Sequence, residues 1–336
     1  MKGLDWLEQN NTLSLIRANG NLEIWKRNDN NSDNDNTDNE NTNTEPDFEI
    51  LHKKENIIDN CIGCMTDTNG TDILCIGANG NIVIVNTSNN KYKYKEFQVD
   101  GPLSAYDVRN SNIALGGREN DLKLYDIKTQ QNIWSAKNVP DDKLMLRVPI
   151  WITAITHINE NPNLIATGTG HKHLRIYDTT VNNSQPINTI DYSEEYRITA
   201  IASTKDGNGV YVADTSGGFH LFDRRNLKRI STYHGYAGSI RDIKVSTDGN
   251  YVTAVGLDRY VRVFDNNGNS NTNKEEARIF LRNRLNSVLL FHDQNNRKNN
   301  KRSRDNDKIV ERGYDDDSDL LEEYEDDEDD DDDDDE

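Results

Sequence analysis

A short phrase recurs six times along this chain, and each copy reads as a β-strand. Apolar and polar residues alternate within it: in YVRVFD, Val261 and Val263 lie on one side of the strand, and Arg262 and Phe264 lie on the other. The copies are NLEIWK at 21–26, NIVIVN at 81–86, DLKLYD at 121–126, HLRIYD at 173–178, GFHLFD at 218–223 and YVRVFD at 260–265. Such a chain is expected to repeat one supersecondary unit rather than to build one continuous sheet.

The copies end 40 to 60 residues apart, and inserts at 28–47 and 135–150 account for the two longest intervals. A hairpin partner precedes each phrase, and a candidate innermost strand lies further upstream. The clearest partners are 112–117, 164–170, 210–218 and 251–256, and the clearest innermost strands are 151–158, 197–203 and 239–245. Three such strands and a weaker outer one make a four-stranded blade. We therefore predict an all-β fold, a WD-type β-propeller with six recognisable blades over residues 1–291, and read 280–291 as an orphan innermost strand.

Composition separates this propeller from two polar segments. Residues 28–47 and 292–336 hold too little apolar surface to offset the entropy of ordering, and we predict that both are disordered. The net charge of the chain is −20, but residues 315–336 contain 18 Asp or Glu and no Lys or Arg, which leaves about −2 for the rest. The tail is basic over 297–304 and acidic over 315–336, and the folded body is near neutral.

Cysteine content and hydropathy indicate the cellular compartment of the protein and the kinds of site that it is expected to hold. Three cysteines argue against a disulfide framework and for a reducing compartment, and neither a secretory signal nor a membrane-spanning apolar run is visible. The pair Cys61 and Cys64 has redox-motif spacing, but its strand-like context favours buried thiols. His171 and His173 lack a completing ligand cluster. We expect an intracellular protein with no membrane contact, cofactor, metal, small-molecule substrate or catalytic residues.

Several stretches of the sequence carry a resemblance to a known family. They are Gly116, Gly117, Glu119 and Asn120, then Ala136 to Val139, then Leu146 to Pro149 with Trp151, then Gly256 to Arg259, and finally Arg284, Leu285 and Asn286. Together they resemble the WD repeat-containing protein 74 family of eukaryotic nucleolar assembly factors of the large ribosomal subunit precursor. The resemblance covers about residues 1–291. It implies a ring of seven blades in which the repeat at 1–26 is the second, so a first blade is largely missing here, and a truncated gene model is the leading explanation.

The resemblance and the residue types together select candidate binding residues. A long insert on a rigid scaffold that mixes charged and apolar side chains suits a protein interface. The first set, in this insert, is Lys137, Asn138, Val139, Arg147, Val148, Pro149 and Trp151; the second set, in two turns, is Arg118, Glu119, Arg259 and Tyr260. The candidates for a nuclear import signal are Arg297, Lys298, Lys301, Arg302 and Arg304.

The resemblance also implies a function. It predicts a non-catalytic scaffold in large-subunit ribosome biogenesis, located in the nucleus and nucleolus, which binds preribosomal particles and other assembly factors. It implies support of rRNA processing, release by an AAA-type ATPase and a possible rRNA contact. The alternatives from sequence are a generic WD-repeat adaptor, such as a ubiquitin-ligase substrate receptor or a histone-binding propeller, and a hydrolase whose catalytic groups converge in the central channel.

Overall fold

The structure is a computed structural model, and it describes residues 3–7, 12–28, 47–67, 70–87, 91–141, 143–159, 161–193, 195–266 and 275–290. The predictions of disorder at 28–47 and 292–336, and the import residues Arg297, Lys298, Lys301, Arg302 and Arg304, lie wholly or almost wholly outside these ranges. Within them, no helix is long and apolar enough to cross a membrane.

The described residues form six antiparallel sheets of four strands, as the sequence predicts. Blade 1 consists of β1 (Gly3–Leu7), β2 (Thr12–Ile16), β3 (Leu22–Asn28) and β4 (Asp47–Lys54); blade 2 of β5 (Cys61–Thr66), β6 (Asp72–Gly77), β7 (Asn81–Asn86) and β8 (Lys93–Gln98); blade 3 of β9 (Ala105–Arg109), β10 (Asn112–Gly117), β11 (Asn120–Asp126) and β12 (Asn132–Ser135). Blade 4 consists of β13 (Ile152–His157), β14 (Leu164–Thr169), β15 (His173–Asp178) and β16 (Asn188–Asp191); blade 5 of β17 (Ile198–Ser203), β18 (Gly209–Asp214), β19 (Phe219–Asp223) and β20 (Arg229–Tyr233); blade 6 of β21 (Ile240–Val245), β22 (Tyr251–Gly256), β23 (Tyr260–Asp265) and β24 (Glu275–Phe280).

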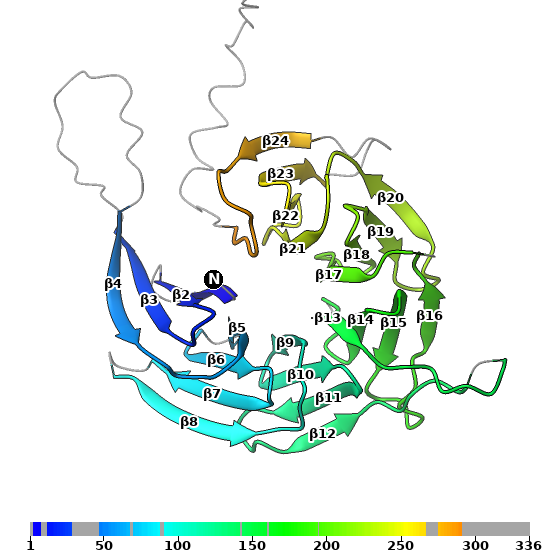
Figure 1. Cartoon of the computed structure of the whole chain (residues 1–336), viewed down its shortest axis with the longest axis horizontal. Coiled ribbons are helices and arrows are strands. Elements are labelled where there is room, and N and C mark those ends of the chain that lie inside the picture. The colour runs from blue at the N-terminus through cyan, green and yellow to red at the C-terminus, as the bar shows by residue number, and fades with distance from the viewer. Residues whose placement is uncertain are drawn as a thin grey trace, which may run out of the picture. The chain divides into compact units, whose positions relative to one another are not determined.

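The six blades lie around a common centre, with the first strand of each blade innermost and the fourth at the rim (Figure 1). The recurring phrase of the sequence is the third strand of every blade. The seven-bladed ring that the resemblance implies stays an expectation, because the described residues form six sheets.

Apolar side chains of the second and third strands fill the spaces between successive blades. One cluster joins Leu174 and Ile176 of blade 4 to Val210 and Val212 of blade 5, and similar clusters lie between the other neighbouring blades. All six residues of β14 and of β18 are buried, which explains their near-continuous small and apolar sequences. Each fully buried Ile, Leu or Val contributes about 1.5–3 kcal/mol, so this packing holds the blades together.

Bulges at the start of the inner strands add polar links between blades. The pairing of β17 with β18 shifts by one residue after Ile198, and the Thr153 hydroxyl of blade 4 donates to the Ile198 carbonyl at 2.7 Å. The pairing of β21 with β22 shifts by one residue after Ile240, and here the Thr199 hydroxyl of blade 5 donates to the Ile240 carbonyl at 2.6 Å. These bonds fix the inner strands of blades 4, 5 and 6 to one another, which makes a rigid base for the loops of these blades.

The segment after blade 6 differs from the sequence prediction. Phe280 ends β24, and residues 281–290 form no strand. The segment still lies against β21, because the Ser287 hydroxyl and the Val288 backbone N–H both donate to the Asp242 carboxylate, at 2.7 and 3.1 Å. The prediction of an innermost strand at 280–291 was therefore wrong in conformation. No described strand pairs with the segment to supply the ladder that a strand needs.

Candidate partner-binding site

The insert between β12 and β13, residues 136–150, leaves blade 3 and runs over the outer part of blade 4. The Lys137 backbone N–H donates to the Ser184 carbonyl at 2.8 Å, and the Gln185 side chain donates to the Asn138 carbonyl at 3.3 Å. Ser184 and Gln185 belong to the connection between β15 and β16. The insert then projects beyond β16 at the rim (Figure 1). We call residues 136–150 the rim loop.

Hydrogen bonds and one ion pair hold the two arms of the rim loop in place. The Asn138 side-chain amide donates to the Val148 carbonyl at 2.8 Å, which joins the arms across the loop. The Glu119 backbone N–H donates to the Ile150 carbonyl at 2.8 Å, and the Glu119 carboxylate accepts from Arg147 Nη1 at 2.7 Å. Glu119 sits in the β10–β11 turn with φ 53°, a conformation that aims it at the loop. These residues therefore shape the loop.

The tip of the rim loop exposes three consecutive large apolar side chains. Leu144, Met145 and Leu146 are 77%, 81% and 59% exposed. Met145 has φ 59°, which turns the chain at the tip. Consecutive exposed side chains of this size, ringed by charged residues, are typical of interface anchors. Lys143 and Arg147 flank the three residues and are exposed themselves.

Trp151 closes the rim loop and enters β13. It pairs with Arg118 in an isolated bridge, and its ring lies 5.9 Å from the Arg118 guanidinium and 5.5 Å from that of Arg197. The His171 ring meets it edge-on at 6.1 Å. A Cβ on Gly170 would lie 2.3 Å from the indole, so glycine is required for this close approach. Trp151 is half-buried: Gly170 and His171 lie against its ring, and the two arginines lie within cation–π distance of it.

The structure brings together nine of the eleven predicted binding residues. Those in or beside the rim loop are Lys137, Asn138, Val139, Arg147, Val148, Pro149, Trp151, Arg118 and Glu119. The sequence analysis missed Met145, and it left Leu144 and Leu146 out of its binding set. A run of three large apolar residues between Lys143 and Arg147 was the signal available.

Arg259 and Tyr260 lie apart from this group, in the β22–β23 turn of blade 6. Arg259 has φ 68°, and Tyr260 packs on the Phe280 ring with centroids 5.2 Å apart. The buried Arg262 guanidinium lies 4.8 Å from the Tyr260 ring and pairs with Asp258, which is also buried. Asp258 is thus structural, and Tyr260 is largely engaged in packing.

The centre of the ring holds a cavity of about 640 Å³ lined by the inner strands of the blades. Charged residues on its wall include Asp5, Asp107, Asp242 and Lys244. Asp242 raises the pKa of Lys244, with further contributions from Asp5 and Asp107, so this lysine offsets the carboxylates around it.

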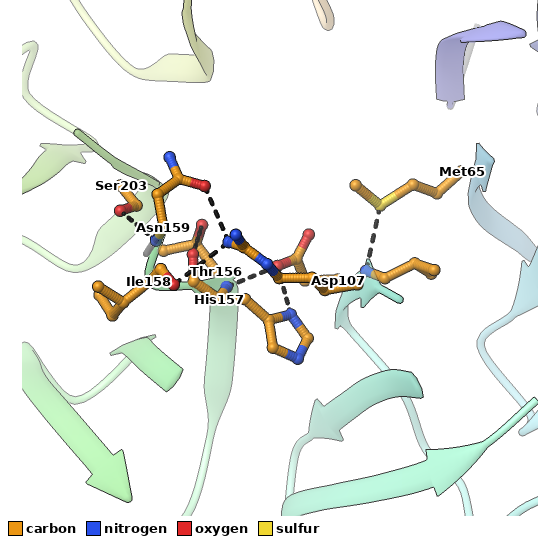
Figure 2. Close-up of polar contacts among 9 residues, drawn as sticks. Met65, Asp107, Thr156, His157, Ile158, Asn159 and Ser203 are labelled. Carbon is orange, nitrogen blue, oxygen red and sulfur yellow. Dashed lines mark hydrogen bonds and ion pairs between the residues drawn. The ribbon is translucent and has the colours of Figure 1, made fainter. Parts of the chain in front are cut away.

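A network of polar contacts occupies one side of this cavity (Figure 2). The Asp107 carboxylate accepts from the His157 backbone N–H at 2.6 Å and lies 2.8 Å from its Nδ1. Arg109 Nη1 donates to the Asn159 side chain at 2.8 Å, and the Asn159 backbone N–H donates to the Ser203 hydroxyl at 3.0 Å. These contacts join β9, the end of β13 and β17. The Asp107–His157 pair of this network therefore links blade 3 to blade 4.

The cysteines and histidines named from the sequence show no ligand site. Cys61, Cys64 and Cys75 are thiols rather than disulfides and are buried, as predicted, and burial raises the pKa of Cys64 and of Cys75 well above the ordinary range. His173 pairs with Asp191 at 3.3 Å. Among the residues that the structure describes, no group of three or more His, Cys, Asp or Glu could hold a metal ion.

Sequence comparison shows which known proteins this chain is similar to. Residues 227–265 match the family WD40, described as "WD domain, G-beta repeat". The chain is 34% identical to WD repeat-containing protein 74 of Homo sapiens over 179 residues, which is 53% of this chain and 45% of that protein. It is 30% identical to ribosome biogenesis protein nsa1 of Schizosaccharomyces pombe over 234 residues, 60% and 59% of the two chains. It is 28% identical to ribosome biogenesis protein NSA1 of Saccharomyces cerevisiae (strain ATCC 204508 / S288c) over 229 residues, 57% and 48%.

The chain spans about half the length of the curated relatives it matches. The WD40 match agrees with the all-β propeller architecture of the chain. The resemblance is therefore confirmed: this chain is a WD-repeat β-propeller protein and a homologue of WD repeat-containing protein 74 and ribosome biogenesis protein NSA1.

Proposed function

We propose that this protein is a non-catalytic docking factor in the biogenesis of the large ribosomal subunit. The names of two of its relatives state ribosome biogenesis, and WD propellers act mainly as rigid interaction platforms. In this proposal the protein binds early preribosomal particles in the nucleolus, together with other assembly factors. It supports rRNA processing and is released by an AAA-type ATPase. The basic segment at 297–304 serves nuclear import.

The observation that carries the proposal is the rim loop. Its arms are fixed by Asn138 and Glu119, so the loop is ordered before a partner arrives and loses little conformational freedom on binding. Its tip presents Leu144, Met145 and Leu146 beyond the rim, where a concave partner surface can enclose them. Lys143 and Arg147 flank the tip, and Lys137 is exposed at the start of the loop, so these cations give the proposed interface a positively charged edge.

The role of the loop as a docking element separates its residues into two kinds. In this proposal Leu144, Met145 and Leu146 are the anchors, and Lys137 contributes to encounter with the partner. Asn138, Glu119 and Arg147 act indirectly, by holding the anchors in position. Substitution of Asn138, Glu119 or Arg147 should weaken binding because the loop loses its fixed conformation. A second change that restores the loop conformation should restore binding.

The test is affinity purification of the tagged full-length protein, followed by quantification of the RNA and proteins that accompany it. We expect enrichment of large-subunit rRNA precursors over small-subunit precursors, together with assembly factors. Recovery of ubiquitin-ligase subunits or histones without precursor rRNA would contradict the proposal and favour a generic adaptor.

The site is tested by replacing Leu144, Met145 and Leu146 with serine. One well-buried apolar anchor accounts for about 2 kcal/mol or more of binding energy, so particle recovery should fall by about 30-fold or more. Ile230, an apolar residue of β20 with 59% exposure, provides the matched control. Ile230→Ser should leave recovery unchanged. Equal recovery with both variants would remove the rim loop from the proposal.

A further inference from the structure

The two flat faces of the propeller carry different charged residues, because different turns and links lie on each face. Strands alternate in direction within a blade, so the β-turn between the second and third strands lies at the same end as the link to the next blade. We call this end the connection face. Its turns are 17–21, 78–80, 118–119, 170–172, 215–218 and 257–259, and its links are 55–60, 99–104, 136–151, 192–197 and 234–239 together with the segment 281–285.

The opposite face carries aspartates that cap its turns. Each aspartate accepts a hydrogen bond from the backbone N–H two residues later, at 2.7–3.2 Å. They are Asp126, Asp178, Asp206, Asp223 and Asp248. This arrangement spreads carboxylates across blades 3 to 6 of this face. These carboxylates repel a polyanion and lie among the exposed cations of the same face, such as Arg225 and Lys228.

On the connection face, two arginines are held over an aromatic ring. The guanidinium carbons of Arg118 and Arg197 lie 5.9 and 5.5 Å from the Trp151 ring, within the range of cation–π attraction. Both arginines are exposed, and neither forms an ion pair with any residue that the structure describes. Two cations from different blades are thus positioned without being neutralised.

A second group of cations lies on the same face at blade 6. The Leu281 backbone N–H donates to the Arg259 carbonyl at 2.8 Å, and the Leu285 backbone N–H donates to the Gly256 carbonyl at 3.2 Å. These bonds bring the segment that carries Arg282 and Arg284 to the turn that carries Arg259. All three arginines are exposed.

Several acidic side chains of this face are already paired. Glu119 binds Arg147 at 2.7 Å, and buried Asp258 binds buried Arg262. Glu195 is exposed two residues before Arg197 and is the nearest opposing charge in that link. Exposed carboxylates also lie in other links of this face, and of these Glu55 pairs with Lys53 and Asp100 with Lys123, whereas Asp59 and Asp141 lie in the links after blades 1 and 3. Around Arg118, Arg197 and the blade 6 group the cations outnumber Glu195, so this part of the connection face is positively charged.

We propose that the connection face binds single-stranded RNA through its sugar–phosphate backbone, with Arg118 and Arg197 on phosphates. The Arg259, Arg282 and Arg284 group extends the path of the strand. Tyr196 is exposed beside Arg197 and offers a ring on which a base can stack. This inference deepens the proposed function and rests on it for the identity of the RNA, which would belong to the large-subunit precursor.

RNA fits this surface better than an acidic peptide does. A guanidinium fork matches the paired oxygens of a phosphate, and the arginines are spread along a path rather than gathered at one pocket. The stacking ring of Tyr196 adds affinity for bases and none for carboxylates.

The experiment measures binding of a fluorescently labelled 20-nucleotide single-stranded RNA to the full-length protein by anisotropy over a range of NaCl concentrations. The test variant is Arg118→Gln with Arg197→Gln. The matched control is Arg225→Gln with Lys228→Gln, which removes two exposed cations from the opposite face. We expect the test variant to bind about tenfold more weakly or worse, with the slope of log K against log salt reduced by about 1.4. The control should change affinity by less than about twofold.

Other outcomes decide against the inference. Equal affinity of the test and control variants would overturn it, as would RNA binding that does not depend on salt. Displacement of the RNA by an equal concentration of poly-glutamate would point to an acidic protein partner instead. Thermal unfolding of both variants establishes that they are folded, which the exposure of all four side chains favours.

The failure of this inference differs from a failure of the proposed function. If the wild type binds no RNA but still purifies with large-subunit precursors, the inference is wrong and the docking function stands. If the wild type binds RNA but recovers no precursor particles, the docking function is wrong. Loss of RNA binding in the test variant, with particle recovery retained through the rim loop, would support both.

Discussion

Removal of the Asp107 carboxylate should destabilise the propeller more than removal of any exposed turn aspartate. Asp107 accepts two hydrogen bonds from one residue of the next blade, the His157 backbone N–H and ring Nδ1, at 2.6 and 2.8 Å. His157 is only 4% exposed, so neither group reaches bulk water when the carboxylate is removed. The substitution to test is Asp107→Ala.

The size of the effect follows from these contacts. A buried donor that loses its partner costs about 1–3 kcal/mol, and a hydrogen bond to a charged group contributes about 1.5–3 kcal/mol. Water from the central cavity can replace part of the loss, because Asp107 lines that cavity. We therefore expect the free energy of unfolding to fall by about 2–4 kcal/mol. With an m-value of about 3 kcal/mol/M, the urea midpoint should fall by about 1 M.

The assay is equilibrium unfolding in urea, followed by intrinsic fluorescence. Asp126→Ala is the matched control, because Asp126 caps an exposed turn by accepting from the Lys128 backbone N–H at 2.8 Å. Its loss should cost about 1 kcal/mol or less. Equal destabilisation by the two substitutions would refute the role given to the Asp107–His157 link. A double-mutant cycle with His157→Ala should give a coupling energy of about 1–3 kcal/mol.

Three further predictions concern other parts of the ring. The buried cysteine thiols should not react with a thiol reagent in the native protein and should all react in denaturing urea, and fast native labelling would contradict their burial. Burial lowers the pKa of His220, so its contribution to stability is complete above the ordinary histidine pKa of about 6.5 and is lost as the pH falls below that value. His220→Gln should therefore flatten the pH dependence of the free energy of unfolding between pH 7 and 5, and an unchanged pH profile would refute this prediction. Gly170→Ala should displace the Trp151 ring and lower the melting temperature, and an unchanged near-ultraviolet circular dichroism signal would show that the indole had not moved.

The sequence predicted the repeating elements of this fold because their signal is local. The third strands β7, β15 and β23 begin and end where the recurring phrase does, since alternation and the preceding turn are both contained in a few residues. The segment 281–290 was assigned wrongly for the complementary reason. Its sequence has the composition of an inner strand, but a strand also needs a neighbour to pair with, and no described strand provides one.

The contacts that define the candidate site could not be predicted from local patterns. Trp151 meets Arg118 and Arg197 from two other connections of the ring, and Asp107 meets His157 fifty residues away. Such pairs depend on the register of one blade against the next, which periodicity within a strand does not specify. The rim loop was recognised from the sequence as an insert that mixes charged and apolar residues. The exposure of Leu144, Met145 and Leu146 at its tip required the structure, because exposure of a loop residue depends on where the arms of the loop are fastened.

The most direct test of the central claim is sedimentation of the full-length protein from cell extract on a sucrose gradient, with large-subunit rRNA precursors measured in every fraction. We predict that the wild type sediments with these precursors. The variant with serine at positions 144 to 146 should move to the light fractions while remaining folded. A wild-type protein found only in the light fractions, in extracts where the precursor particles are intact, would contradict the claim that this propeller docks on the large-subunit precursor.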